Sequence, residues 1–336
     1  MLKSQINPIQ DTSLLLCHEL RTPLTSIQGA LKLLGYQHLG SLSEDAQHLL
    51  AIAIDNADRL VRLANALEVQ TTPLLTVLST AKVELLQLEN DLYKAIERRE
   101  FYLVYQPIVC LETSQIIGFE ALARWRHDTR GEISPQVFIP LAEKANLICD
   151  IGLFLLDKAC CQLSQWQAEF PSSNPLSISV NLSAIQLQSG KLVEKVSQIL
   201  SKNSLPFGSL KLEITESALV ENEDVAVKTL VKLQQLGVQI YIDDFGTGYS
   251  SLGRLQELPF DTLKIDQSFV RNKNWVMSET ILMLAQKLNL DVIVEGVESL
   301  EELTALKQLG CRKMQGYFFS KPTDPAGVAA LLNHKI

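Results

Sequence analysis

From Phe101 onward the chain alternates between short strand-like segments and helix-length segments, and this alternation limits the fold more than any other feature. The first two strand-like segments start at Tyr102 and Ile116. Too few residues separate them for a parallel crossover, so they must form an antiparallel hairpin. Eight strands, mostly in βα order, predict an α/β fold: a TIM-type (β/α)8 barrel with one antiparallel strand. An open doubly wound sheet is the alternative that periodicity alone leaves.

Oxygen-bearing side chains stand where these strands end, the face on which such barrels build their sites. They are Glu120, Asn181, Glu213, Asp243, Asp244, Glu295 and Gln315, with Lys264 as the cation among them. Any one of them could be a capping group or part of a surface turn. Bringing several carboxylates together without compensation costs several kcal/mol, so cations are expected between them.

The neighbouring acids Asp243 and Asp244 illustrate the point, because two carboxylates at one strand end repel each other unless a cation or proton lies between them. All the candidate ligands are hard oxygen atoms, and no His or Cys occupies these strand ends. Mg²⁺ or Mn²⁺ is therefore favoured over zinc.

The first hundred residues predict helices with almost no strand signal. Apolar residues recur at spacings of three and four in two segments. The first segment ends at a break that starts at Gly35, and the second ends at a break that includes Pro73. The predicted organisation is an all-α helical hairpin over residues 1–72, a connecting helix over 73–99 and the barrel over 100–336. A hairpin of this size buries little by itself, so its apolar stripes are expected to pair with a second copy in a homodimer.

Composition excludes several classes of protein. A net charge of −8 over 336 residues argues against general nucleic-acid binding. No apolar run reaches the length of a membrane span, and the N-terminus lacks an export signal. The six cysteines include no CxxC pair, which suits a reducing compartment. A cytoplasmic protein without a membrane span is expected.

The segment CHELRTPLTSIQGALKLL, from Cys17 to Leu34, resembles the phosphoacceptor box of the dimerisation and phosphotransfer (HisKA) helices of sensor histidine kinases. The resemblance implies that His18 accepts a phosphoryl group and that Thr22 assists its removal, with Glu19 beside the imidazole. His18 lies about 200° round the helix from the apolar stripe, on the solvent side. The family's ATP-binding domain is not found, so a response regulator or histidine kinase acting in trans is expected as the partner.

The barrel segment, from about Leu88 to Leu332, resembles the EAL-domain phosphodiesterases of cyclic di-GMP signalling. The motifs that carry the resemblance include EALARW, SVNLSAIQL, LEITES, IDDFGTGYSSL, VEGVES and QGYFFSKP. By position it implies one metal ion on Glu120, Asn181, Glu213 and Asp243, and a second on Asp243, Asp244 and Glu295. It also implies a catalytic set of Lys264, Glu295 and Gln315, with Arg124 on a substrate phosphate and Glu216 anchoring the DDFGTG loop.

The function expected from this resemblance is metal-dependent hydrolysis of cyclic di-GMP to linear pGpG, a bacterial second-messenger reaction that phosphotransfer to His18 would regulate. Two alternatives remain from the residues themselves. One is a receptor that binds cyclic di-GMP without cleaving it. The other is a phosphotransfer protein of a two-component system, in which case the helices and His18 carry the function. If neither partner nor donor exists, the helices only dimerise the chain.

Overall fold

The computed structural model describes residues 76–215, 218, 223–247 and 258–333, together with Ile27 and Ala57. It divides the chain into two compact units, Met1–Lys94 and Ala95–Ile336. The predicted helical hairpin over 1–72, with His18, Glu19 and Thr22, lies outside the described residues, as does Glu216. Among the residues that are described, every helix is too short or too polar to cross a lipid bilayer.

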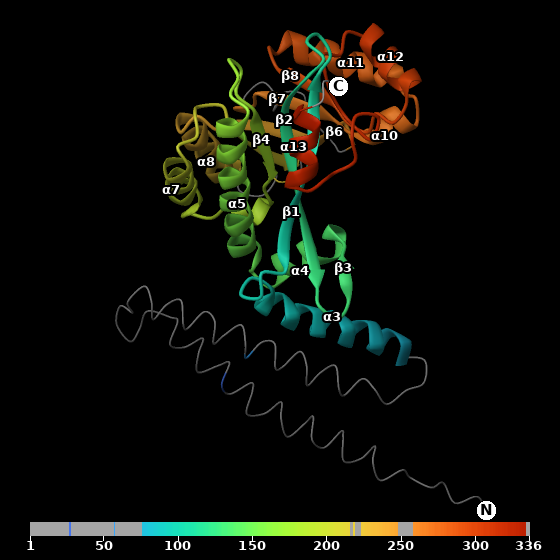
Figure 1. The fold of residues 1–336 in the computed structure, drawn as a ribbon. Coiled ribbons are helices and arrows are strands. Elements are labelled where there is room, and N and C mark those ends of the chain that lie inside the picture. The colour runs from blue at the N-terminus through green and yellow to red at the C-terminus, as the bar shows by residue number, and fades with distance from the viewer. Residues whose placement is uncertain are drawn as a thin grey trace, which may run out of the picture. The chain divides into compact units, whose positions relative to one another are not determined.

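The second unit is a closed barrel, as predicted (Figure 1). Its strands are β1 (Phe101–Cys110), β2 (Gln115–His127), β3 (Gly131–Ile133), β4 (Ser177–Asn181), β5 (Leu210–Thr215), β6 (Gln239–Phe245), β7 (Thr262–Ile265), β8 (Asp291–Val294) and β9 (Lys313–Gln315). The hydrogen-bonded order is β1-β9-β8-β7-β6-β5-β4-β2-β3, and an additional β1–β2 pairing closes the ring. This closure rules out the open doubly wound sheet, because an open sheet keeps two unpaired edges.

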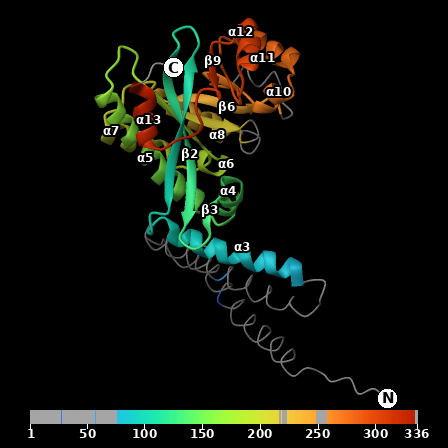
Figure 2. The same cartoon turned by 45° about the vertical axis from the view of Figure 1, so that its right-hand side comes forward.

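Strand direction also agrees with the sequence prediction. The pairs from β2–β4 to β8–β9 are parallel, whereas β1 is antiparallel to both β2 and β9. β1 and β2 form a long twisted hairpin in which Gln106 lies opposite Glu120 (Figure 2). The short strand β3, which the sequence reading did not predict, lies outside the ring and pairs only with β2.

The described residues also form a set of helices. They are α3 (Thr76–Ala95), α4 (Pro135–Lys144), α5 (Ile148–Glu169), α6 (Ala184–Leu187), α7 (Leu192–Asn203), α8 (Glu223–Gln235), α10 (Gln267–Arg271), α11 (Trp275–Lys287), α12 (Leu300–Gln308) and α13 (Pro325–Asn333). The helix α3 belongs to the first unit up to Lys94, and the others belong to the second. In both views α5 and α7 lie beside each other, on a different side of the barrel from α11 and α12.

Aromatic side chains fill the layer between the hairpin and the helices beside it. The indole ring of Trp166 on α5 contacts Tyr105 and Phe119, with ring centroids 4.8 Å and 5.2 Å away. Inside the barrel, Ile108, Tyr241 and Ile293 form a buried apolar cluster. Burial of large apolar side chains on both faces holds the strands in register, since a slip of one residue would turn every side chain to the other face.

Candidate active site

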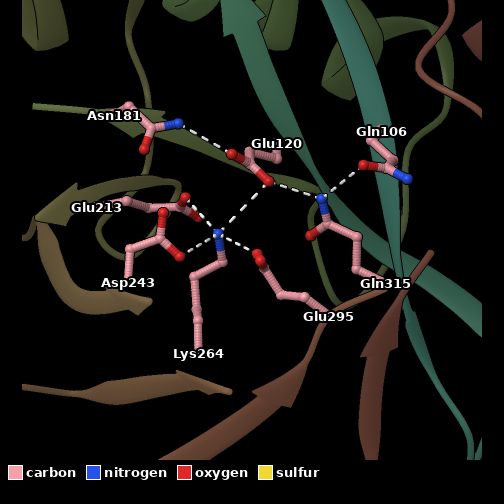
Figure 3. A network of polar contacts seen from close by, with 8 residues as sticks. All are labelled: Gln106, Glu120, Asn181, Glu213, Asp243, Lys264, Glu295 and Gln315. Carbon is pink, nitrogen blue, oxygen red and sulfur yellow. Dashed lines mark hydrogen bonds and ion pairs between the residues drawn. The ribbon is translucent and has the colours of Figure 1, made fainter. Parts of the chain in front are cut away.

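One cation lies among four buried or half-buried acids at the centre of the site. Lys264 Nζ is 2.5 Å from Glu295 Oε1, 2.6 Å from Glu213 Oε2, 3.1 Å from Asp243 Oδ1 and 3.4 Å from Glu120 Oε2. The side chains come from five different strands or the residues just after them, and Figure 3 shows them converging on the ammonium group. Glu213, Asp243 and Lys264 lie near the carboxyl ends of β5, β6 and β7 and Glu295 just follows β8, at one rim of the barrel. Glu120 was expected at a strand end but lies in the middle of β2, because the β1–β2 hairpin continues past this rim.

Amide side chains complete this network. Asn181 Nδ2, at the end of β4, donates to Glu120 Oε1 at 2.9 Å. Gln315 Nε2, at the end of β9, donates to Glu120 Oε2 at 2.6 Å and to Gln106 Oε1 at 3.0 Å. Both oxygens of Glu120 are thus held by fixed donors, so its carboxylate has one orientation.

The two adjacent acids on β6 can act together because the strand is irregular there. In a regular strand Asp243 and Asp244 would point to opposite faces. The register between β6 and β7 shifts between Ile242 and Phe245, and Asp244 has a positive φ of 53°. This bulge brings one oxygen each of Asp243, Asp244 and Glu295 within 4.8 Å of one another, a spacing that could hold a metal ion.

Burial, together with the crowding of carboxylates, raises the pKa values of three acids in the site. Burial, followed by the charge of Glu120, raises the pKa of Glu213 well above its ordinary value. Burial also raises the pKa of Glu295 to about 8, and burial together with Asp243 raises that of Asp244 to about 6. Burial would lower the pKa of Lys264, but the surrounding carboxylates outweigh it and hold that pKa well above the ordinary value.

The oxygen atoms of the site are suitable ligands for a divalent cation. Buried oxygens of Glu213 (Oε1) and Gln315 (Oε1) have no hydrogen-bond partner among the residues that the structure describes. Leaving such acceptors unpaired costs about 1–3 kcal/mol each, more for a charged group. Hard oxygen ligands without His or Cys are those that Mg²⁺ and Mn²⁺ take in proteins.

Arg124 is the one described candidate that lies apart from this network. Its Nη1 donates to the backbone oxygen of Ala123 at 2.8 Å. It lines a pocket of 470 Å³ at the end of the hairpin where β3 pairs with β2, four residues beyond Glu120 on β2. The lining residues are Tyr102, Arg124, Arg126, Glu132, Ile133, Ser134 and Pro135.

Gln106 is the member of the network that the sequence reading missed. It lies in the middle of β1 and not at a strand end, and its exposed fraction is 8%. The signal in the sequence was a polar residue within an otherwise buried strand. Such a residue must find hydrogen-bond partners in the barrel interior.

The chain around these residues matches a known family. Residues 89–322 match the EAL domain, and residues 15–70 match the His Kinase A (phospho-acceptor) domain. The chain belongs to the EAL domain family. EAL domains generally depend on divalent metal ions.

Relatives of this EAL protein include two curated bacterial proteins. The bifunctional diguanylate cyclase/cyclic di-GMP phosphodiesterase MucR of Pseudomonas aeruginosa is 42% identical over 248 residues, which are 71% of this chain and 35% of MucR. The oxygen sensor protein DosP of Escherichia coli is 40% identical over 262 residues, 75% of this chain and 32% of DosP. The chain therefore spans about a third of the length of either relative.

Solved structures of EAL proteins have the same fold. The PaMucR phosphodiesterase in complex with c-di-GMP is 40% identical, with a TM-score of 0.68, and the match covers 72% of this chain and 99% of that one. The cAMP- and cyclic-di-GMP-bound form of the EAL enzyme Bd1971 is 32% identical with a TM-score of 0.71, over 87% of this chain and 77% of that one.

A close backbone contact supports the strand end that carries Gln315, and it yields a first prediction. A methyl group at Gly316 would overlap the backbone oxygen and nitrogen of Val297, two residues after Glu295. Neither backbone segment can move aside cheaply, so Gly316→Ala is expected to destabilise the protein by about 1–3 kcal/mol. It should also lower activity by displacing Gln315.

Urea unfolding and enzyme assay of the variant test this prediction. Gly190→Ala is the matched control, because nothing lies within 4 Å of a methyl group there. Equal stability of the two variants would contradict the role given to Gly316.

Proposed function

We propose that this chain hydrolyses cyclic di-GMP to linear pGpG in a reaction that requires divalent cations. The observation that carries the proposal is the convergence of Glu120, Glu213, Asp243 and Glu295 on Lys264, in a chain whose residues 89–322 match the EAL domain. The similarity to MucR and to the PaMucR complex supports the choice of cyclic di-GMP as substrate.

Charge balance supports two Mg²⁺ or Mn²⁺ ions in each site. With all five carboxylates ionised, the ammonium group of Lys264 leaves four negative charges, which two divalent cations would neutralise. One ion would be held by Glu120, Asn181, Glu213 and Asp243, and the other by Asp243, Asp244 and Glu295. When bound, a pair of such ions supplies Lewis-acid polarisation of a phosphodiester and a nucleophilic water at neutral pH.

The residues of the chain then divide the remaining tasks. Lys264 keeps its proton among the acids, balances part of their charge and orients the attacking water. Gln315 fixes the carboxylate of Glu120 through the 2.6 Å hydrogen bond. The buried floor of the barrel beneath them, formed by Ile108, Tyr241 and Ile293, excludes bulk water and strengthens these electrostatic interactions.

The decisive experiment incubates the purified chain with cyclic di-GMP and Mg²⁺ or Mn²⁺ and separates the products by chromatography. Linear pGpG that forms with metal and not in excess EDTA is the expected result. Binding of cyclic di-GMP without any product would favour the alternative, a receptor that senses the dinucleotide. A receptor gains little from Lys264 or from so many acids, which is why hydrolysis is preferred.

Arg124 gives a second prediction, because among the described residues only Nη1 of its guanidinium has a hydrogen-bond partner, which leaves the other donors for a substrate phosphate. Hydrogen bonds to charged groups contribute about 1.5–3 kcal/mol, so Arg124→Ala should raise KM for cyclic di-GMP about tenfold or more. The matched control is Arg126→Ala in the same pocket. The guanidinium of Arg126 is already engaged, 2.7 Å from Glu132 Oε1, so its removal should change KM less. Steady-state kinetics of both variants provide the test, and equal effects would count against a phosphate contact for Arg124.

Phosphotransfer to His18 is a separate proposal, supported by the His Kinase A match over residues 15–70. A histidine kinase or phosphorylated response regulator acting in trans would be the phosphoryl donor. The added charge would change how a homodimer, formed through the N-terminal helices, holds the two barrels, and so adjust their phosphodiesterase activity. Acid-labile phosphate should appear on the wild type and not on His18→Gln when candidate donors are supplied, with ATP alone as the control. No label with any donor would leave the helices as a dimerisation device.

We also propose that the protein is located in the cytoplasm. The cysteines at 110, 149, 160, 161 and 311 are free. Free thiols are usual in a reducing compartment.

A further inference from the structure

Gln106 connects the site to the loop that follows β9. Its Nε2 donates to the backbone oxygen of Ser320 at 3.3 Å, and its Oε1 accepts from Gln315 Nε2 at 3.0 Å. Gln315 Nε2 in turn donates to Glu120 Oε2 at 2.6 Å. The result is a chain of hydrogen bonds from a backbone carbonyl, through two amides, to a candidate metal ligand (Figure 3).

The acceptors at the two ends of this series of hydrogen bonds determine the orientation of both side-chain amides, Gln106 and Gln315. A backbone carbonyl and an ionised carboxylate can only accept hydrogen bonds. Gln106 must therefore turn its NH₂ group to Ser320, which leaves its oxygen facing Gln315. Gln315 must then turn its NH₂ group toward both Gln106 and Glu120. Reversing the amide of Gln106 would set two oxygens against each other at Ser320 and two NH₂ groups against each other at Gln315.

This arrangement uses both N–H groups of Gln315 and commits its oxygen to the site. The Oε1 of Gln315 is buried and has no hydrogen-bond partner in the described part of the chain. In Figure 3 it points toward the side of the network where Lys264 and Glu295 lie, not toward Gln106. A buried acceptor of this kind is costly unless a ligand donates to it.

We propose that Gln106 is a positioning residue of the site: it locks the amide of Gln315 so that Gln315 both orients Glu120 for metal binding and presents Oε1 to a ligand. Gln106 acts through Gln315 and not by holding the metal itself. The inference deepens the proposed function and rests on the same site. It predicts that removing Gln106 weakens metal binding and turnover only as long as Gln315 is present.

The experiment is a double-mutant cycle in the full chain with Gln106→Met, Gln315→Met and the double variant. Mn²⁺ affinity is measured by calorimetry without substrate, kcat and KM are measured with cyclic di-GMP, and thermal unfolding reports folding. Losing a partner that orients a metal ligand typically costs about tenfold to a hundredfold in metal affinity or activity, which is the effect expected for Gln106→Met. The double variant should be no worse than Gln315→Met alone, because residues that act as a unit are not additive.

Gln167→Met is the matched control. Gln167 Nε2 on α5 donates to Leu176 O at 2.6 Å and to Ser209 Oγ at 3.1 Å, away from the site. This variant should lose stability, keep wild-type Mn²⁺ affinity and combine additively with Gln315→Met. Unchanged Mn²⁺ affinity and kcat in folded Gln106→Met, or additive losses in its double variant, would overturn the inference. A wild type that binds Mn²⁺ but does not hydrolyse cyclic di-GMP would reject the proposed function, and the calorimetric cycle would still decide on Gln106.

Discussion

Replacing Asp243 by Asn is expected to reduce hydrolysis of cyclic di-GMP about a hundredfold or more. Asp243 is the acid that both proposed metal positions share, and it also lies 3.1 Å from Lys264 Nζ. The substitution keeps the size and shape of the side chain, so the loss would come from charge alone. Without that charge the protein should bind Mg²⁺ or Mn²⁺ more weakly, and turnover should recover only in part at high metal concentration.

Asp291→Asn is the control for Asp243→Asn. Asp291 begins β8 at the opposite end of the barrel, where its Oδ2 lies 2.7 Å from Lys313 Nζ in an exposed ion pair. Exposed pairs contribute about 0–1 kcal/mol, so this variant should keep wild-type activity. Titration of each variant with Mn²⁺ while product formation is followed makes the comparison. Wild-type rates in Asp243→Asn at limiting metal would refute the two-metal proposal.

Replacing Lys264 by Met is expected to lower the free energy of unfolding of the metal-free protein by about 3–5 kcal/mol, as is typical when one partner of a buried ion pair is removed. The ammonium group is fully buried and faces four carboxylates, which the variant would leave without a counter-charge. Divalent cations should restore more stability to this variant than to the wild type. Turnover should remain low even then, because the attacking water would have lost the group that orients it.

Lys211→Met separates this effect from the burial of a lysine in general. Lys211 lies on β5, and burial lowers its pKa to about 8, with a further contribution from Lys313. Its amine contacts the face of Tyr241 and, among the described residues, it forms no ion pair with a buried acid, although the charges of Asp291, Asp261 and Glu213 act on it. Replacing it should be nearly neutral or stabilising. Urea unfolding of both variants in EDTA is the measurement, and equal losses would show that the acids do not depend on Lys264.

Local sequence was enough to predict the strands of the ring and most of the site, but the choice of a closed barrel over an open sheet needed the tertiary structure. Apolar alternation marked all the strands of the ring, and the short link between the first two required an antiparallel hairpin. The acids and amides from Glu120 to Gln315 could be predicted as one group because parallel strands end on one rim, whichever helices surround them. The side chain types then indicated hard cations.

The strand β1 shows why Gln106 could not be found in the same way. A search of carboxyl strand ends works for strands that run in the common direction. β1 runs in the opposite direction, and the β1–β2 hairpin continues past the strands of the ring, so Gln106 lies in the middle of its strand opposite Glu120 and not at its end. Only the pairing register of the closed barrel places it there. The short strand β3 escaped prediction for a related reason, since three residues carry no periodicity.

The sequence by itself determined the order of strands, the reversed first strand and the residue types at the rim, because these follow from periodicity, link length and side chain chemistry. The tertiary structure decided which of these groups touch. The bulge at Asp244, with its φ of 53°, turns two neighbouring acids toward the same site. Closure of the barrel brings Lys264 against acids up to 144 positions away in sequence. Such contacts depend on strand register and local backbone geometry, which no single segment of the sequence contains.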